Sequence, residues 1–447
     1  MTTGLILSGG GARAAYQVGV LKAVAEILPR DVYNPFPVIS GTSAGSVNAL
    51  AIAGRPGHFR LRVRKLEKIW GTMGPDRIYR TDYPGLLKNS VNLLLSFMHS
   101  GYAIGQPKAL LDNQPLRELL AGYIRFRHIE EAIASGELQA VSITAMSYTT
   151  GQSVTFFQGK DHLQPWERFR RVGVRERLTI DHLMASSAIP TLFPARQIGG
   201  AFYGDGALRQ LKPISPALQL GADRLFVIGV SDNPGQARPG SRFSHSPSIA
   251  QIVGHMFNSA FIDSMESDLE TLRTINSLAN VMTPEQRRAA GDIERKPVEV
   301  LAISPSRPID ELACDYLHQL PRSIRFFLRV TGATARGGGA SAASYLLFAS
   351  GFCQELLKLG YQDGRQQREA LRSFSPSTVK APVVCRVRGR RPMKRPTGRR
   401  RYWLPGRLFP GHCSRSCRTG CSASARSRRR CRPGRPGKCR RSRSPAI

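Results

Sequence analysis

The stretch that decides the fold reads Pro37-Val38-Ile39-Ser40-Gly41-Thr42-Ser43-Ala44-Gly45-Ser46-Val47-Asn48. A short apolar run ends in a Gly-x-Ser-x-Gly motif, and a small-residue helical segment over residues 44–53 follows at once. This order is typical of a nucleophile elbow, in which a sharp strand-to-helix turn holds a serine, here Ser43, at its tip. Gly41 and Gly45 suit such a turn, because it leaves no room for Cβ atoms beside the nucleophile. The motif alone also fits an ordinary loop, so the rest of the chain must decide.

A second glycine cluster follows the first apolar run of the chain. Residues 4–8 (GLILS) lead into Gly9-Gly10-Gly11-Ala12-Arg13-Ala14, and apolar residues then recur at helical spacing to about Leu28. A strand, a glycine turn and a helix together make a nest of backbone N–H groups that suits an anion. This nest fits a dinucleotide fingerprint, a phosphate loop or an oxyanion hole.

The sequence favours the oxyanion hole among these three. A dinucleotide fingerprint needs a glycine where Ala14 stands and an acidic residue after the next strand, which here ends at Ser43. A Walker-type phosphate loop needs Gly-Lys-Ser/Thr, which is absent from this loop. Only the oxyanion hole uses both glycine motifs. Arg13 would hold the loop or an anionic group of the substrate, and the amide donors would be those of Gly9, Gly10, Gly11 and Ala44.

The residues leave two candidates for the catalytic base. An α/β-hydrolase would use a histidine that comes last in chain order, here His245, His255 or His318. The other candidate is Asp205, which stands between Gly204 and Gly206 in a pattern that is also common in plain β-turns. A carboxylate can act as the base only if it lies close to the serine Oγ and is desolvated enough to raise its pKa.

Charge is distributed unevenly over the 447 residues. The formal net charge is +34, but residues 376–447 contain 23 Lys and Arg and no Asp or Glu, which leaves +11 for residues 1–375. The body of the chain is therefore basic without a nucleic-acid-binding signature of its own. We expect any contact with nucleic acid to be confined to the tail.

Cysteine follows the same division. Only Cys314 and Cys353 precede residue 376, which is typical of a reducing compartment. The tail holds the other six (Cys385, Cys413, Cys417, Cys421, Cys431 and Cys439) in a sequence rich in Arg, Pro, Ser and Gly. Their spacing resembles a zinc site only loosely, because such sites pair cysteines at two- to four-residue gaps with a matched second pair. We favour a solvated, disordered basic tail, or a terminus read out of frame in a GC-rich gene.

The remaining patterns give the order of elements. We expect a capping or core helix over Leu86–Met98, a hairpin at a sheet edge over residues 138–158, and a long helix over Ser248–Leu278. Further strands are expected at Arg224–Val230 and Val298–Ile303, and helices at residues 55–70, 106–123, 128–134, 180–187, 322–330, 342–359 and 366–374. The expected domains are 1–232 (catalytic), 233–375 (a helical and strand region that completes or flanks it) and 376–447 (tail).

Nothing in the sequence predicts secretion or a membrane span. Residues 1–8 have no basic start of the kind that opens a signal peptide, and no run of 18 or more apolar residues occurs. We expect a cytoplasmic protein whose contact with a membrane, if it has one, is peripheral.

Taken together, these motifs resemble those of the bacterial type of patatin-like phospholipase. That family carries a glycine-rich oxyanion loop, a Gly-x-Ser-x-Gly elbow and an Asp-Gly-Ala/Gly motif, which correspond here to residues 9–14, 41–45 and 205–207. The segment Ala185-Ser186-Ser187-Ala188-Ile189-Pro190, followed by Phe193-Pro194, is also typical. The resemblance is strong over about residues 3–230 and weaker to about 374. The one departure is Ala14, where the family signature ends in glycine.

The resemblance implies a three-layer α/β/α fold with a mostly parallel central sheet, followed by a helical C-terminal extension. It implies that Ser43 and Asp205 form a catalytic dyad, and that membrane lipids or phospholipids are hydrolysed through an acyl-serine intermediate without metal or cofactor. Gly41, Gly45, Gly206 and Arg13 would support the motifs. The alternatives are a catalytically silent lipid- or protein-binding module with this fold, and a Ser-His-Asp esterase.

Overall fold

The computed structural model describes residues 1–80, 82–98, 109–231, 248–283, 285–286, 297–330 and 340–374. Two predictions lie outside these residues: that for His245 and that for the tail at 376–447.

A single ten-stranded sheet runs through the described part of the chain. β10, β9, β1, β2 and β3 lie side by side in that order and are all parallel, whereas β4 joins β3 antiparallel and is followed by β6 and β5. β8 pairs with the far end of β3, and β7 pairs with β8. The strands are Thr3–Leu7 (β1), Val38–Thr42 (β2), Ala140–Ser147 (β3), Ser153–Gly159 (β4), Trp166–Arg168 (β5), Arg171–Arg175 (β6), Arg196–Ile198 (β7), Ala201–Asp205 (β8), Arg224–Ile228 (β9) and Glu299–Ile303 (β10).

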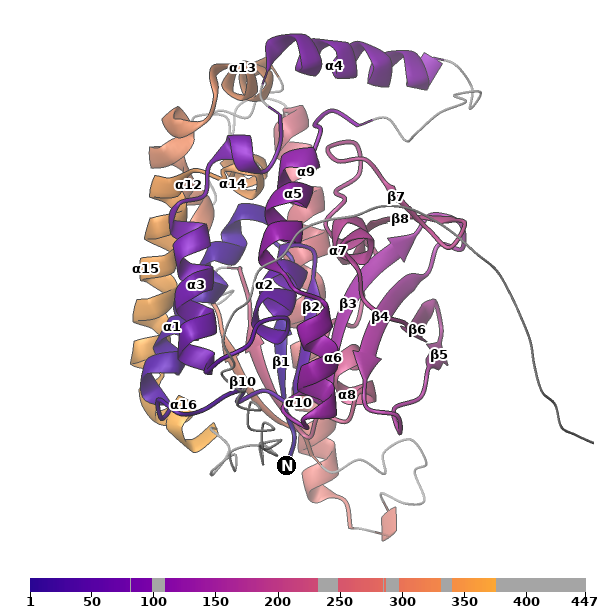
Figure 1. Ribbon diagram of the computed structural model, residues 1–447, viewed down its shortest axis with the longest axis vertical. Coiled ribbons are helices and arrows are strands. Elements are labelled where there is room, and N and C mark those ends of the chain that lie inside the picture. The colour runs from indigo at the N-terminus through magenta and orange to yellow at the C-terminus, as the bar shows by residue number, and fades with distance from the viewer. Residues whose placement is uncertain are drawn as a thin grey trace, which may run out of the picture. The chain divides into compact units, whose positions relative to one another are not determined.

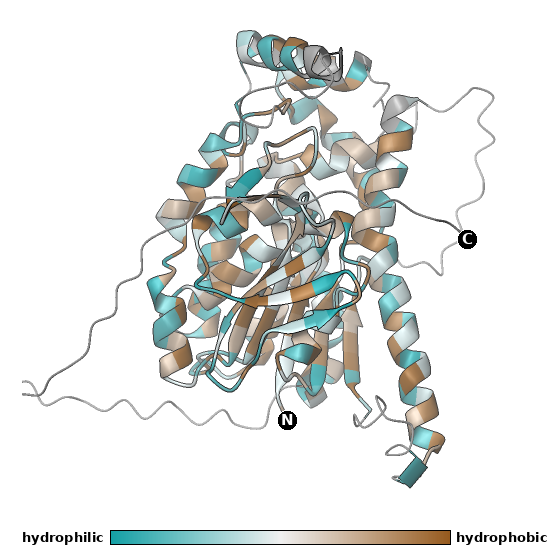
Figure 2. Ribbon diagram, turned by 90° about the vertical axis from the view of Figure 1, so that its right-hand side faces the viewer, coloured by the Kyte–Doolittle hydropathy of each residue, from teal (hydrophilic) through white to brown (hydrophobic). Residues whose placement is uncertain are grey.

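Helices cover both faces of the sheet, which confirms the predicted three-layer α/β/α fold. On one face, Leu5, Ile39 and Phe226 belong to a core that includes α1, α2, α3 and α15; on the other, Ile6 and Val227 pack with α8 and α10. Because alternate residues of a strand point to opposite faces, a strand buried on both sides reads as one continuous apolar run. Figure 1 shows α1, α3 and α15 side by side, and Figure 2 shows the central strands as largely hydrophobic.

The helical segments were mostly predicted in the right places. The helices are Ala15–Ile27 (α1), Ala44–Ala53 (α2), Phe59–Gly71 (α3), Tyr83–Met98 (α4), Gln114–Tyr123 (α5), Arg127–Ala134 (α6), Ile180–Ser186 (α7), Ser215–Gln219 (α8), Ile249–Asn258 (α9), Ser264–Val281 (α10), Ile309–Tyr316 (α12), Arg322–Val330 (α13), Ala340–Leu346 (α14), Ser350–Gln366 (α15) and Arg368–Phe374 (α16). A short 3-10 helix, η1 (Gly11–Ala14), precedes α1, and a π-helical turn, η4 (Ser259–Asp263), joins α9 to α10.

Two predictions about these elements were wrong. The hairpin is present as β3 and β4, but it does not lie at a sheet edge, because β3 also pairs with β2 and β8 while β6 covers β4. β5 and β6 are short (WER and RVGVR), and neither was expected from the sequence. The core interpretation of α4 is also wrong for Leu87 and Val91, whose side chains are 66% and 47% exposed. The capping interpretation of α4 stays a prediction.

None of the helices in the described ranges combines the length and the apolar character that crossing a membrane would require.

α1 and α15 pack at unusually close range through glycine. A Cβ at Gly360 would stand 2.1 Å from the Tyr16 carbonyl oxygen, and a Cβ at Gly19 would stand 2.1 Å from that of Leu357. Since real Cβ atoms do not approach backbone oxygen so closely, the two helices can lie at this distance only with glycine at both positions. α1 follows directly after the glycine loop of residues 9–11, so this contact also supports that loop from behind.

Replacing Gly360 with alanine is expected to lower the free energy of unfolding by about 2 kcal/mol or more, because the added Cβ forces the two helices apart. The matched Gly122→Ala change in α5 should be neutral or stabilising by about 0.5–1 kcal/mol, since a Cβ there meets nothing within 4 Å and alanine is the better helix former. Urea unfolding followed by circular dichroism measures both. Equal stabilities would contradict the close packing of α1 on α15.

Candidate active site

The sheet topology brings Ser43 next to Asp205. β2 pairs with the first part of β3 and ends opposite Thr144, whereas β8 runs the other way along the last part, so that Asp205 stands opposite Ala145. β4 occupies the other edge of β3, and β2 and β8 therefore lie end to end along one edge. The residue that follows β2 and the last residue of β8 meet at this junction.

Ser43 occupies a strained turn between β2 and α2. Its φ of 53° and ψ of −128° lie outside the regions that non-glycine residues prefer, and such a conformation costs about 1–3 kcal/mol. The Ser43 amide donates to Ser186 Oγ at 3.0 Å, and Ser186 Oγ donates to the Thr144 carbonyl at 2.6 Å, which fastens the turn to β3. A Cβ at Gly45 would stand 2.2 Å from the Leu7 carbonyl oxygen, so only glycine fits where α2 crosses the end of β1.

Asp205 is completely buried, and its carboxylate contacts Ser43. Ser43 Oγ donates to Asp205 Oδ2 at 2.5 Å, and the Ala207 amide donates to Oδ1 at 3.0 Å. Burial raises the pKa of Asp205 to about 7, although both hydrogen bonds oppose the shift. The carboxyl group can therefore exchange a proton close to neutral pH.

The glycine loop after β1 lies beside Ser43. Gly11 begins η1, and both Gly11 and Ala44 line the same cavity as Ser43. A Cβ at Gly9 would stand 3.2 Å from the Ser43 Cβ, which shows how closely the loop approaches the nucleophile. The carbonyl of Gly10 accepts a hydrogen bond at 3.1 Å that closes the turn of η1. The structure thus places the glycine loop beside Ser43 and the start of α2, and the role of its amides stays a prediction.

Arg13 is buried and points away from the cavity toward α14. Its Nε donates to Ser344 Oγ at 2.8 Å, one terminal nitrogen donates to Ser341, and the guanidinium lies 4.2 Å from the centre of the Tyr345 ring. Of the two roles predicted for Arg13, these contacts favour holding the loop over binding an anionic group of the substrate.

A chain of buried amides connects the glycine loop to α2 and α3. Gln17 Nε2 donates to the Ser8 carbonyl at 2.8 Å, Asn48 Nδ2 donates to Gln17 Oε1 at 2.9 Å and to the Ala14 carbonyl at 3.1 Å, and Trp70 Nε1 donates to Asn48 Oδ1 at 2.8 Å. Buried polar groups that are fully hydrogen-bonded fix the relative position of the segments that carry them. Here they fix the loop, the elbow helix and one wall of the cavity.

Residues 5–218, which contain Ser43 and Asp205, match the family model described as Patatin-like phospholipase. This region belongs to the patatin-like phospholipase family. Among curated proteins, a cGAMP-activated phospholipase of Pseudomonas aeruginosa (strain BWHPSA011 / Pa011) is 28% identical over 205 residues, which are 46% of this chain and 52% of the relative. The chain thus spans about half the length of that relative.

Two solved structures are similar to the chain at low identity. VipD from Legionella pneumophila matches with a TM-score of 0.30 and 13% identity over 83% of this chain and 67% of its own. Human GIVD cytosolic phospholipase A2 matches with a TM-score of 0.39 and 12% identity over 83% of this chain and 59% of its own.

An apolar cavity of about 50 Å³ opens beside Ser43 in the patatin-like domain. Its walls come from α3, α5 and the segment that follows α7, and Phe193 of that segment is buried in one of these walls. Such a volume is well below the 300–1,000 Å³ of typical ligand pockets. The lining side chains are Val47, Leu66, Ile69, Trp70, Met73, Ile78, Leu116, Leu119, Leu120, Tyr123, Ile189, Phe193 and Phe348.

The structure adds two polar residues of the patatin-like domain that sequence reasoning missed. Ser186 holds the Ser43 amide, and Gln210 accepts from Thr42 Oγ1 and donates to Thr144 Oγ1 at 3.1 Å. Ser186 lies in the family-typical Ala-Ser-Ser segment, which was a usable signal. Gln210 belongs to no motif in the sequence, and only the folded structure reveals its hydrogen bonds with Thr42 and Thr144.

The other predicted site residues are placed as follows. Gly41 packs against the start of α2, and Gly206 packs against the Thr144 carbonyl. His255 and His318 are exposed, whereas Ser43 and Asp205 are buried. Within the described ranges, no three His, Cys, Asp or Glu side chains are grouped in a way that could hold a metal ion.

Asp205→Asn is expected to stabilise the protein at pH 8. The pKa of Asp205 rises from 3.8 to about 7 on folding, so the buried carboxylate costs stability as pH increases through this interval and costs most above 7, on the order of 4 kcal/mol. Chemical denaturation at pH 8 and at pH 5 should show a larger gain at pH 8. The exposed Asp161→Asn control should show no such difference. An equal gain at both pH values would contradict the raised pKa.

Proposed function

We propose that the protein is a lipid acyl hydrolase that cleaves carboxylic esters through a Ser43–Asp205 dyad. The observation that carries the proposal is the direct hydrogen bond between Ser43 Oγ and Asp205 Oδ2. In a Ser-His-Asp triad the carboxylate contacts the histidine and the histidine contacts the serine. Here the carboxylate itself reaches the serine, which supports a dyad without histidine.

In the proposed reaction, Asp205 takes the proton of Ser43 as Oγ attacks the carbonyl carbon of the ester. The protonated Asp205 then gives that proton to the leaving alcohol as the ester C–O bond breaks, which leaves an acyl group on Ser43. Water then attacks the acyl-serine and gives a proton to Asp205. The bond between the acyl carbon and Oγ breaks as Asp205 returns that proton to Ser43, and the carboxylic acid is released. A base is most effective when its pKa is close to the working pH, and burial brings Asp205 into that range.

The developing negative charge would be held by backbone amides. The loop of Gly9, Gly10 and Gly11 reaches Ser43 from β1, and the N-terminus of α2 begins at Ala44. Amides at a helix N-terminus carry a partial positive charge and need no reorganisation when the oxyanion forms. The contacts of Arg13 with α14 would keep the loop in this position.

A lipid substrate is supported by the family and by the cavity. Patatin-like phospholipases hydrolyse lipid esters as a family, and the curated relative is named a phospholipase. The cavity beside Ser43 is lined almost entirely by aliphatic and aromatic side chains, which favour an acyl chain over a polar group. We infer that the acyl chain enters between α3 and α5.

Ser43→Ala should abolish labelling of the protein by a fluorophosphonate probe, and Asp205→Asn should lower kcat/KM for a p-nitrophenyl ester by two or more orders of magnitude.

In the native protein, kcat/KM should rise with pH and level off above about 7, because only the carboxylate form of Asp205 accepts the proton. His255→Ala and His318→Ala are the controls and should keep most activity. A folded but inactive histidine variant would exclude the dyad, and a native protein that is never labelled would favour a silent binding module.

Leu119→Ala should shift the preference of the enzyme toward longer acyl chains. Leu119 is a partly buried residue of α5 that lines the cavity, so truncating it widens the cavity at modest cost in stability. We expect the ratio of kcat/KM for p-nitrophenyl octanoate to that for the butyrate to increase several-fold. The exposed Leu87→Ala change in α4 is the control. An unchanged ratio would argue against an acyl site between α3 and α5.

A further inference from the structure

A second, polar cavity lies behind the wall of the apolar one. It has a volume of about 370 Å³, and it is bounded by the segment between α2 and α3 and by α6 with the residues after it. This volume falls within the usual range of small-molecule sites. Its polar side chains are those of Tyr33, Arg55, Arg62, His128, Glu131 and Glu137.

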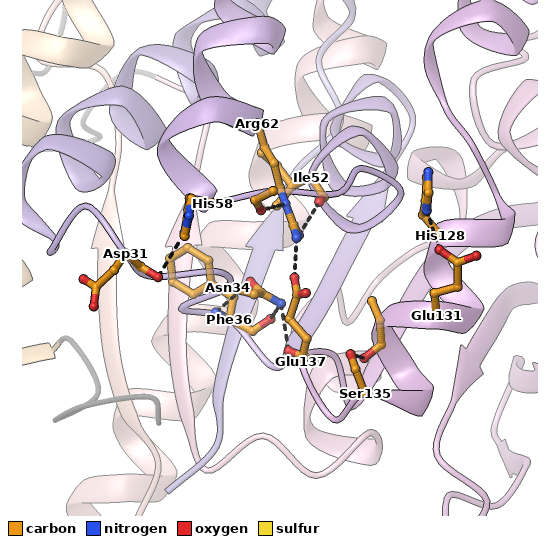
Figure 3. A network of polar contacts seen from close by, with 12 residues as sticks. Asp31, Asn34, Phe36, Ile52, His58, Arg62, His128, Glu131, Ser135 and Glu137 are labelled. Carbon is orange, nitrogen blue, oxygen red and sulfur yellow. Dashed lines mark hydrogen bonds and ion pairs between the residues drawn. The ribbon is translucent and has the colours of Figure 1, made fainter. Parts of the chain in front are cut away.

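Both carboxylates that line this cavity are already paired. Glu137 forms an ion pair with Arg62, which is 2% exposed and also donates to the carbonyls of Gly57 and Ile52 at 2.8 and 3.0 Å. Figure 3 shows Arg62 of α3 facing Glu137, with His128 and Glu131 on α6.

Glu131 is held from two sides. His128 Nδ1 lies 2.6 Å from one of its oxygens, and Arg127 Nε lies 3.2 Å from the other. Neither acid on the cavity wall therefore needs a further cation.

Arg55 is different, because its charge has no acidic partner in the described part of the chain. Its guanidinium stacks on the Tyr123 ring at 3.8 Å from the ring centre, and its Nε is buried without a hydrogen-bond partner among the described residues. A guanidinium presents a planar fork of donors that matches the two oxygens of a carboxylate or a phosphate. A guanidinium without an acidic partner is stabilised when an oxyanion pairs with it.

We propose that this cavity is a binding site for a small soluble organic anion, whose carboxylate or phosphate group pairs with Arg55. In this proposal Arg62 does not bind the anion, since each of its three nitrogens already donates to a protein acceptor. It holds the segment that carries Arg55 against α2. The remainder of the ligand lies against Tyr33 and the α6 wall.

Tyr123 connects this site with the apolar cavity. Its ring stacks on Arg55, and Tyr123 also lines the cavity of Ser43. An anion that draws the Arg55 guanidinium toward itself alters the packing of the Tyr123 ring. Occupancy of the polar cavity therefore changes the wall of the apolar one.

Binding is tested in the Ser43→Ala background, so that the result does not depend on hydrolysis. Inorganic pyrophosphate and succinate are titrated separately by calorimetry at constant ionic strength, which distinguishes a phosphate site from a carboxylate site. Because the basic tail also attracts anions, the readout is the difference between Arg55→Gln and Arg64→Gln, an exposed arginine of α3 outside the cavity. Arg55→Gln should weaken saturable binding of at least one probe tenfold or more, and Arg64→Gln should leave it unchanged.

Equal affinities of the two variants for both probes would overturn the site. If circular dichroism shows that Arg55→Gln does not fold, Arg55→Lys is used in its place. Lysine keeps the positive charge but lacks the planar fork of donors, so weakened binding is again expected. The coupling rests on the proposed hydrolase function and is tested separately with p-nitrophenyl butyrate. A saturating anion should change KM at least twofold in the native protein but not in Arg55→Gln. An unchanged KM in both would overturn the coupling and leave the binding result standing.

Discussion

The contact between Ser43 and Asp205 depends on one feature of the sheet, namely that β2 and β8 share an edge of β3 from opposite directions. In a purely parallel sheet, no second strand would lie end to end with the elbow strand. A carboxylate could then approach the elbow only from a loop. Here the carboxylate is the last residue of a strand that is hydrogen-bonded to the same neighbour as the elbow strand. The two groups are therefore positioned by backbone pairing, which is the most rigid support that the fold offers.

This arrangement costs stability, and the surrounding residues offset the cost. Ser43 is held in an unfavourable backbone conformation, and the Asp205 carboxyl group is removed from water. Ser186 fastens the turn, the Ala207 amide solvates the carboxylate, and the buried amides of Gln17 and Asn48 tie the glycine loop to α2. Strain and a raised pKa of this kind are typical of catalytic sites, because the same features make a serine accessible and a carboxylate basic.

Much of the fold follows from local patterns. Continuous apolar runs mark β1, β2 and β9 because parallel strands are buried on both faces, and helical spacing marks α1, α3 and α10. The hairpin was predicted at a sheet edge, but the short strand β6 pairs with β4, and β5 extends the sheet beyond β6. For α4, whose apolar residues suggested either a cap or a core helix, the core interpretation does not hold for Leu87 and Val91, which are exposed. In both cases the neighbours of an element decide its environment, and local composition does not record those neighbours.

For the candidate site, the sequence by itself determined the chemical groups: a serine between two glycines, a glycine loop after the first strand, and an aspartate in a Gly-Asp-Gly turn. These are recognisable because tight turns restrict which residues fit. The family resemblance implied that Ser43 and Asp205 form a pair, but only the tertiary structure shows which atoms meet and how. The pairing of Asp205 with Ser43, the turning of Arg13 toward α14, and the stacking of Arg55 on Tyr123 join residues 162, 331 and 68 positions apart at their nearest contacts. No local pattern can encode such distances, because they arise from how strands and helices pack.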